Sequence, residues 1–181
     1  GAEYYQKLGY ALQKNKKYAE AIDAYLKADT LKPDNIWNNR HLAICYRLNR
    51  NYQAALSYYK KVEEATPEST NVIFHIGSCL AELGQYEEAA NYFFKLDFIE
   101  SNCIKAWRGI GWCSFISQKH EQAMKYYEKI IEHKPLAIDY MNAGHVAWVM
   151  GNIQKAAVLY GKAITACGTR ERFLEMFHKD E

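Results

Sequence analysis

The sequence has little proline, no long apolar run and no excess of charge of one sign. Three of its 181 residues are proline, and no stretch approaches the ~18 consecutive apolar residues of a membrane-spanning helix. Lysines and arginines number 23 against 21 acidic residues, a formal net charge of +2, so overall charge does not drive the chain onto nucleic acid or an anionic membrane. Phosphate-binding glycine loops and the G-x-S-x-G setting of a serine nucleophile are missing as well. These absences argue against an enzyme, and we expect neither catalytic residues nor a cofactor.

The few prolines are regularly spaced. Pro33, Pro67 and Pro135 are separated by 34 and 68 residues, which is one and two periods of 34. A search for self-similarity at this period identifies five repeats. They span residues 2–35, 36–69, 70–103, 104–136 and 137–168. Apolar residues make up 49% of the chain, enough to give such an array a continuous core.

Certain positions of the repeat always carry one kind of residue. The eighth residue is small, namely Gly9, Ala43, Gly77, Gly111 and Gly144. The twentieth residue is alanine in every repeat, and the twenty-fourth is aromatic, namely Tyr25, Tyr59, Phe93, Tyr127 and Tyr160. Apolar residues at the fourth, seventh, eighth and eleventh positions form one helix face, and those at the twentieth, twenty-fourth and twenty-seventh form another. Each repeat therefore predicts two amphipathic helices that cross at small residues, and the fold class is all-α.

This pattern resembles that of the tetratricopeptide repeat (TPR) family, which places Trp, Leu, Gly, Tyr, Ala, Phe, Ala and Pro at set positions over 34 residues. The fourth repeat carries the resemblance most clearly through Trp107, Ile110, Gly111, Ala123, Tyr127 and Pro135. The resemblance implies a right-handed α-α superhelix whose first helices line a concave groove that, in relatives, holds an extended peptide or a partner helix.

One variant of the family clamps a terminal carboxylate with Lys, Asn and Arg side chains on three consecutive first helices. In this sequence the corresponding positions carry Gln6, Tyr10, His41, Asn71 and His75. That clamp is therefore absent from the first three repeats. Starting one repeat later, the positions carry Arg40, Ile44, His75, Lys105 and Gly109, which match it at best in part.

Residues 169–181 follow the last repeat. Phe173, Leu174, Met176 and Phe177 form an apolar stripe at helical spacing, which predicts a capping helix over the end of the fifth repeat. No equivalent polar helix precedes Tyr5, so the N-terminal end is expected to be uncapped and available for self-association.

The face of each first helix that points away from the core is rich in basic and aromatic residues. It comprises the second, fifth, sixth, ninth, twelfth and thirteenth positions, which line the groove in TPR relatives. The candidate binding residues are Tyr10, Trp37, Arg40, His41, Arg47, Phe74, His75, Lys105, Arg108, Trp112, Phe115, His145 and Trp148. The same face also includes Lys7, Lys14, Met141 and Asn142. Six lysines and arginines against only Glu3 and Glu82 give this face an expected charge of six minus two, about +4.

Aromatic and arginine side chains are enriched at binding hot spots because they combine contact area with planar hydrogen bonding. We therefore expect a non-enzymatic protein-interaction module that binds an acidic or aromatic segment of a protein or peptide, and neither nucleic acid nor a membrane. The alternative is a rigid spacer or self-associating segment of a longer solenoid.

The cysteines do not indicate a disulfide or a metal site. Cys45, Cys79 and Cys113 share the tenth position of three consecutive repeats, a small buried slot, and lie farther apart than the ~7 Å limit for bridging Cα atoms. Cys103 and Cys167 lack a C-x-x-C partner, and the groove histidines lack a nearby third ligand. Reduced thiols in this number favour a reducing compartment such as the cytoplasm.

We expect the three thiols of this column to be protected in the native protein, because a buried thiol reacts slowly. Titration with a thiol reagent should leave Cys45, Cys79 and Cys113 unmodified until the chain is denatured. Immediate modification of all three would place the column on the surface instead.

Overall fold

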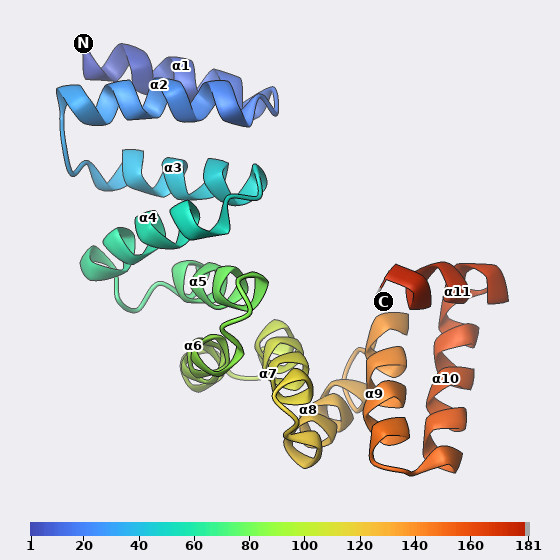
Figure 1. Cartoon of the computed structure of the whole chain (residues 1–181). Helices are drawn as coiled ribbons and strands as arrows, with labels where there is room; N and C mark the ends of the chain where they lie inside the picture. The colour runs from blue at the N-terminus through green and yellow to red at the C-terminus, as the bar shows by residue number, and fades with distance from the viewer. Residues whose placement is uncertain (180–181) are drawn as a thin grey trace. The chain divides into compact units, whose positions relative to one another are not determined.

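The computed structural model of the chain describes residues 1–179, and this part consists of eleven α-helices and no strand (Figure 1). The helices are α1 (Ala2–Lys14), α2 (Tyr18–Leu31), α3 (Ile36–Leu48), α4 (Tyr52–Ala65), α5 (Thr70–Glu82), α6 (Tyr86–Ile99), α7 (Ile104–Ile116), α8 (His120–Ile131), α9 (Ala137–Val149), α10 (Ile153–Cys167) and α11 (Arg170–Lys179). The all-α prediction is confirmed, with two helices in each repeat and one more after residue 168. None of the described helices is long and apolar enough to cross a membrane.

The helices form two compact units, Gly1–Tyr92 and the residues from Phe93 onward. The division falls inside α6. Phe93 packs on Gly109 of α7, where an added Cβ atom would meet the Phe93 ring at 2.5 Å. The second half of α6 therefore belongs with the helices that follow it.

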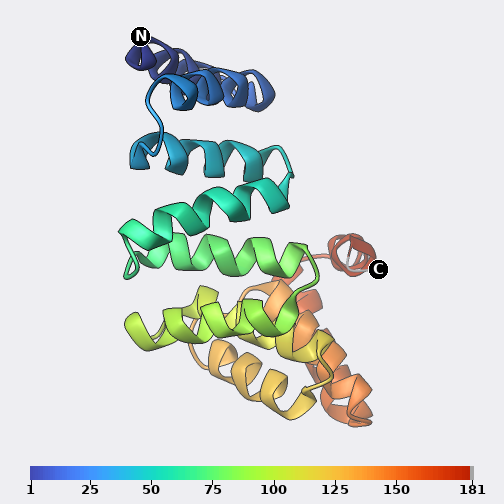
Figure 2. The same ribbon diagram turned by 60° about the vertical axis from the view of Figure 1, so that its left-hand side comes forward.

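In the first unit, α1 to α5 follow one another in space in the order of the sequence (Figures 1 and 2). α1 packs on α2 and α3 on α4, while α2 contacts α3 and α4 contacts α5. A core cluster in this unit joins both hairpins and contains Ala21, Ile22, Tyr25, Leu42 and Cys45. The two apolar stripes of each repeat predict this packing, in which each helix buries one face against its neighbours.

In the second unit, α7 packs on α8 and α9 on α10, with α8 in contact with α9. One core cluster is built around Trp107 and Tyr127. Another joins Met141 of α9 and Ala163 of α10 to Phe173 of α11. The C-terminal helix therefore covers the last hairpin, as the apolar stripe of residues 173–177 predicts.

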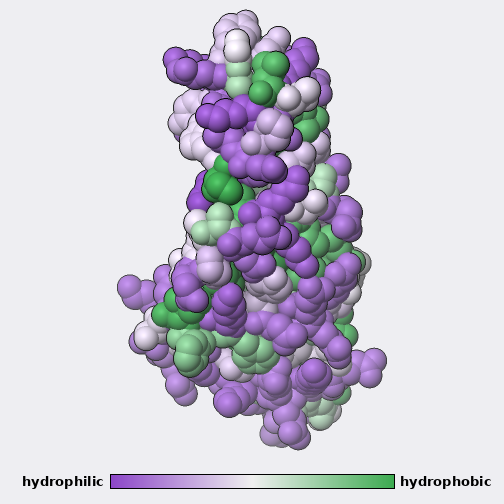
Figure 3. Space-filling model, turned by 90° about the vertical axis from the view of Figure 1, so that its left-hand side faces the viewer, coloured by the Kyte–Doolittle hydropathy of each residue, from purple (hydrophilic) through white to green (hydrophobic). Residues whose placement is uncertain are grey.

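The side of the molecule drawn in Figure 3 is mostly hydrophilic, and its apolar residues form small separate patches. Polar side chains also fix several helix starts. Asn35, Asn51 and Asn152 each accept a hydrogen bond from the backbone N–H three residues later, at 2.9, 3.2 and 3.1 Å. Such caps satisfy one of the unpaired N–H groups of the first turn.

The turn inside each hairpin contains one residue in the left-handed backbone region. It is always the fifteenth residue of the repeat, namely Lys16, Arg50, Gly84, Gln118 and Gly151, with φ between 60° and 81°. Glycine adopts this region freely, whereas other residues incur about 1–2 kcal/mol. Two of the five residues are glycines, and all five turns place this residue in the same backbone region.

The small eighth residue makes room for the aromatic ring at the twenty-fourth position. A Cβ atom on Gly9 would lie 2.7 Å from the Tyr25 ring, and one on Gly144 would lie 2.7 Å from the Tyr160 ring. Gly111 faces the Tyr127 ring in the same way, at 3.0 Å. The two helices of a hairpin therefore approach closely because a ring of one lies flat against the backbone of the other.

Gly111→Leu should destabilise the protein by about 1–3 kcal/mol, because the added side chain must displace the buried ring of Tyr127. Gly161→Leu is the matched control: Gly161 lies in α10 with ordinary helical φ and nothing within 4 Å of its added Cβ. This change should leave stability equal or higher, since glycine is the poorer helix former by roughly 0.5–1 kcal/mol. Urea denaturation measures both, and equal midpoints for the two variants would contradict the packing described here.

Candidate functional site

Three predicted binding residues gather on α1 and α3 in the first unit. The ring centroid of His41 lies 4.0 Å from that of Trp37 and 5.6 Å from that of Tyr10. Tyr10 and Trp37 remain 41% and 43% exposed, so their rings are accessible to a partner. This cluster unites residues from two repeats.

The His41 side chain is hydrogen-bonded to Gln13, a residue that the sequence analysis did not identify as a candidate. The side-chain oxygen of Gln13 accepts hydrogen bonds from the Tyr25 hydroxyl at 2.8 Å and from His41 Nδ1 at 2.9 Å. Burial lowers the pKa of His41, and the nearby charges of Arg40 and Lys14 lower it further. The imidazole is therefore neutral at pH 7 and contributes a flat ring rather than a charge.

A second hollow in the first unit lies between the end of α3 and α5. It encloses about 340 Å³ and is lined by Arg47, Leu48, Arg50, Tyr52, Phe74, His75, Ser78, Cys79 and Glu82. Arg47 Nε donates a hydrogen bond to the hydroxyl of the buried Tyr59 at 3.1 Å. The Tyr59 ring in turn stacks on His75, with centroids 5.6 Å apart and planes at 16°. Three predicted residues, Arg47, Phe74 and His75, therefore meet in one pocket.

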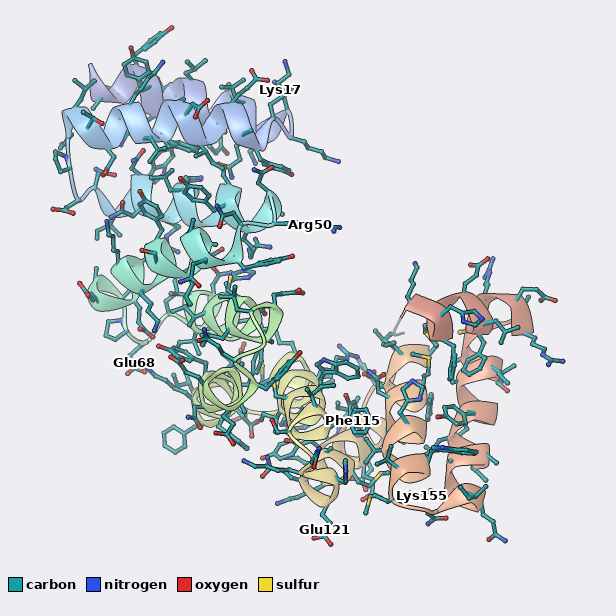
Figure 4. All side chains as sticks on the ribbon, in the orientation of Figure 1. Lys17, Arg50, Glu68, Phe115, Glu121 and Lys155 are labelled. Carbon is teal, nitrogen blue, oxygen red and sulfur yellow. The ribbon has the colours of Figure 1, made fainter. Side chains whose placement is uncertain are left out.

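The second unit contains an aromatic pocket on α7, α9, α10 and α11. It encloses about 480 Å³ and is lined by Phe115, His145, Trp148, Val149, Tyr160 and Phe177. In Figure 4, the Phe115 side chain lies on the side of α7 that faces α9. His145 Nδ1 and the Tyr160 hydroxyl are 2.7 Å apart, within hydrogen-bond distance. We call this hollow the aromatic pocket.

Of the six residues that line the aromatic pocket, three were predicted and three, namely Val149, Tyr160 and Phe177, were not. Phe115, His145 and Trp148 come from the predicted face, and Trp112 adds a ring 5.9 Å from that of Phe115. Tyr160 was assigned only to the hairpin core and Phe177 only to the capping stripe. Phe177 could have been found from its place on a helix that covers α9 and α10, where its ring lies 5.3 Å from His145.

Two residues of the predicted face have structural roles instead. Met141 is completely buried against Ala163 and Phe173, because α11 covers that part of α9. The Arg108 guanidinium donates from Nε and Nη2 to the two carboxylate oxygens of Asp139, both at 2.8 Å. Lys105, by contrast, is exposed on the same helix.

Asp139 was not among the acids counted on this face. Its side chain is 1% exposed, and it also accepts a hydrogen bond from the backbone N–H of Leu136 at 2.7 Å, at the start of α9. The Arg108 charge is therefore neutralised within the fold. The expected charge of about +4 on this face falls by one when Asp139 is included.

The cysteines form no disulfide within residues 1–179. All five cysteines are free thiols, and Cys45, Cys79 and Cys113 are at most 1% exposed. Burial raises the pKa of each of these three thiols to about 11, which keeps them protonated at pH 7. No group of three or more His, Cys, Asp or Glu side chains in this range could hold a metal ion.

Comparisons with known proteins identify the repeats. The family described as "Tetratricopeptide repeat" matches residues 2–35 and 104–135, and the family described as "Anaphase-promoting complex, cyclosome, subunit 3" matches residues 31–96. The chain is a tetratricopeptide repeat protein. The TPR prediction is thereby confirmed, and the protein belongs to a class of non-enzymatic modules that bind proteins or peptides.

Solved structures of other proteins share the fold. YrrB, described as a TPR protein with an unusual peptide-binding site, superposes with a TM-score of 0.80 at 21% identity over 98% of this chain and 92% of its own. MamA from Desulfovibrio magneticus RS-1 gives a TM-score of 0.84 at 15% identity over 91% of this chain and 94% of its own. A further MamA structure gives 0.80 at 21% identity over 87% and 93% of the two chains. No curated protein sequence is similar enough to this TPR protein to count as a match.

Arg108→Glu should destabilise this TPR protein by about 3 kcal/mol, because it leaves the buried Asp139 carboxylate facing a second negative charge. Arg40→Glu is the matched control, since Arg40 is also the fifth residue of its repeat but forms no ion pair with any carboxylate of residues 1–179. Its stability should stay within about 0.5 kcal/mol of the wild type, as for most surface changes. Thermal and urea unfolding of the two variants check this, and an equally stable Arg108→Glu variant would show that the ion pair contributes nothing.

Proposed function

We propose that this TPR protein binds an extended segment of a partner protein along the exposed faces of its first helices, with an apolar side chain of that segment seated in the aromatic pocket. The observation that carries the proposal is the aromatic pocket itself, an open hollow of about 480 Å³ with aromatic walls. Pockets of roughly 300–1,000 Å³ with apolar walls and a few polar groups are typical ligand sites.

The chemistry of the pocket walls selects an apolar occupant. Trp148 remains 57% exposed and Val149 53%, so two large apolar side chains at the mouth stay in contact with water while the pocket is open. In the pocket wall, His145 Nδ1 and the Tyr160 hydroxyl are hydrogen-bonded to each other, so these two polar atoms already have a partner. An aromatic or aliphatic side chain that fills the pocket would bury these surfaces, and the removal of apolar surface from water contributes about 25 cal/mol per Å², against which the cost of ordering the segment is set.

Positive charge on α3 of the first unit supports acidic residues in the bound segment. Arg40 and Arg47, two turns apart on α3, form no ion pair with a carboxylate in the described part of the chain. Complementary acidic residues on a partner would accelerate association through long-range attraction. YrrB is described as having an unusual peptide-binding site, which supports peptide recognition as a use of this fold.

Self-association is the second candidate, and exposed apolar residues of the first hairpin favour it. Tyr4 is 63% exposed, Leu8 38% and Leu31 57%. A hollow of about 410 Å³ on the same part of the unit is lined by Glu3, Gln6, Lys7, Tyr10, Ala11 and Trp37. A mass by light scattering that rises with protein concentration would favour this function, whereas a constant monomer mass would favour peptide binding.

The free thiols suggest where the protein works. Five reduced cysteines with no disulfide in the described residues favour a reducing compartment such as the cytoplasm. We include that location, and a protein partner rather than nucleic acid or a membrane, in the proposal.

Peptides selected from a random display library against the full chain should lose affinity by about 2 kcal/mol when Phe115 or Trp148 is replaced by alanine, the scale of a hot-spot truncation. Phe98→Ala is the matched control, because Phe98 lies in the same unit but is 91% exposed and outside the pocket. Calorimetry with each variant measures the change. Equal binding by all three variants would mean that the aromatic pocket is not the recognition site.

A further inference from the structure

The pocket between α3 and α5 in the first unit has the features of a site for a single anion. Its two cationic side chains are Arg47 near the end of α3 and Arg50 in the following turn. In Figure 4, Arg50 extends away from that turn. Neither guanidinium forms an ion pair with any carboxylate of the described residues, in contrast to Arg108 with Asp139. Two guanidinium groups at one hollow therefore have no carboxylate of the described residues within ion-pair distance.

Arg47 is positioned before any ligand arrives. Its Nε donates to the hydroxyl of Tyr59, a side chain only 1% exposed, which fixes the guanidinium plane and leaves the two terminal NH₂ groups to other acceptors. The ring of Tyr59 is fixed in turn by stacking on His75. A guanidinium that is already oriented loses less side-chain freedom on binding, which strengthens its interaction with a planar anion.

The remaining walls define what kind of anion fits. Leu48 and Phe74 supply apolar surface, which strengthens electrostatic attraction by excluding water. Ser78 donates its hydroxyl to the Phe74 carbonyl at 3.0 Å, so its proton is already engaged. Glu82 is the only carboxylate among the residues that line the pocket. Two arginines and one glutamate give a charge of two minus one, or +1.

We propose that this pocket binds one carboxylate, the side chain of an aspartate or glutamate in the partner segment. A charge of +1 is balanced by a single carboxylate, whereas the nearly doubly charged phosphate of a phosphorylated residue would leave an excess negative charge beside Glu82. The proposal rests on the proposed function, because the carboxylate belongs to the bound segment. Arg47, Arg50 and Glu82 do not occupy the positions that form the terminal-carboxylate clamp of some TPR proteins. The proposed site is therefore a different arrangement from that clamp.

Short peptides without an apolar side chain test the carboxylate pocket separately from the aromatic pocket. The probes are acetyl-Gly-Ser-Glu-Ser-Gly-amide and its counterparts with glutamine or phosphoserine in the central position. Each is titrated into the ¹⁵N-labelled full chain at constant ionic strength. We expect the glutamate peptide to cause saturable shifts of the amides of residues 47–52 and 74–82 and of the Arg47 Nε–H, and the glutamine peptide to cause none.

Substitutions then assign the effect to named side chains. Arg47→Gln should weaken binding of the glutamate peptide about tenfold, the loss of one charge-assisted hydrogen-bonding group. Arg170→Gln removes the same charge from the exposed start of α11 and should change nothing. Tyr59→Phe keeps the charge of Arg47 but removes its hydrogen bond, so a weaker affinity for this variant identifies Tyr59 as a positioning residue.

Arg50→Gln provides a second route if Arg47→Gln fails to fold. Glutamine tolerates this backbone conformation, since Gln118 occupies the same place in the fourth repeat with φ 63° against 62° at Arg50. This variant should also weaken the glutamate peptide. The proposal is overturned if the glutamate peptide causes no saturable shift in residues 47–52 and 74–82, or if the phosphoserine peptide binds more tightly. Either result leaves the aromatic pocket untouched, because its own test uses Phe115 and Trp148.

Discussion

The packing of one aromatic ring against one glycine is the contact that joins the two helices of three of the five hairpins. Tyr25 against Gly9, Tyr127 against Gly111 and Tyr160 against Gly144 bring the two helices of a repeat together at a fixed distance. A hairpin of two helices cannot bury its apolar faces alone, so this contact must recur for neighbouring repeats to stack with matching surfaces. Each hairpin turn also contains one residue in the left-handed backbone region, always at the same position of the repeat.

The same tyrosines connect the core to the binding face. Tyr25 donates its hydroxyl to Gln13, which also binds His41; the Tyr59 hydroxyl accepts from Arg47; and the Tyr160 hydroxyl lies within hydrogen-bond distance of His145. In three of the five repeats, a ring that packs the hairpin therefore also orients a polar side chain of the first helix. Because the ring is rigid and enclosed, these side chains are held in place before a partner binds, and preorganisation of this kind reduces the entropic cost of association.

Two arginines at the same position of the repeat show how context changes a role. Arg40 and Arg108 are both fifth residues of first helices. Arg108 meets the buried carboxylate of Asp139 and stabilises the start of α9, whereas Arg40 meets no carboxylate in the described residues and stays available to a partner. The periodicity of the sequence cannot separate these roles, because the difference comes from a residue thirty-one positions further along the chain.

The repeat period, the two helices per repeat, the TPR fold and the buried column of Cys45, Cys79 and Cys113 were all determined by the sequence alone. Spacing at 34 residues and small or aromatic residues at fixed positions are local properties, and local properties decide which helix face is buried. Of the thirteen predicted binding residues, Tyr10, Trp37, Lys105 and Trp148 are exposed and the other nine are half-buried. The tertiary structure alone decided three features: the pairing of Arg108 with Asp139, the burial of Met141 under α11, and the place of Phe177 in the aromatic pocket. Each of these depends on contacts between residues of different helices. Residues far apart in the sequence meet only when the helices pack, and a pattern read along one helix does not contain that information.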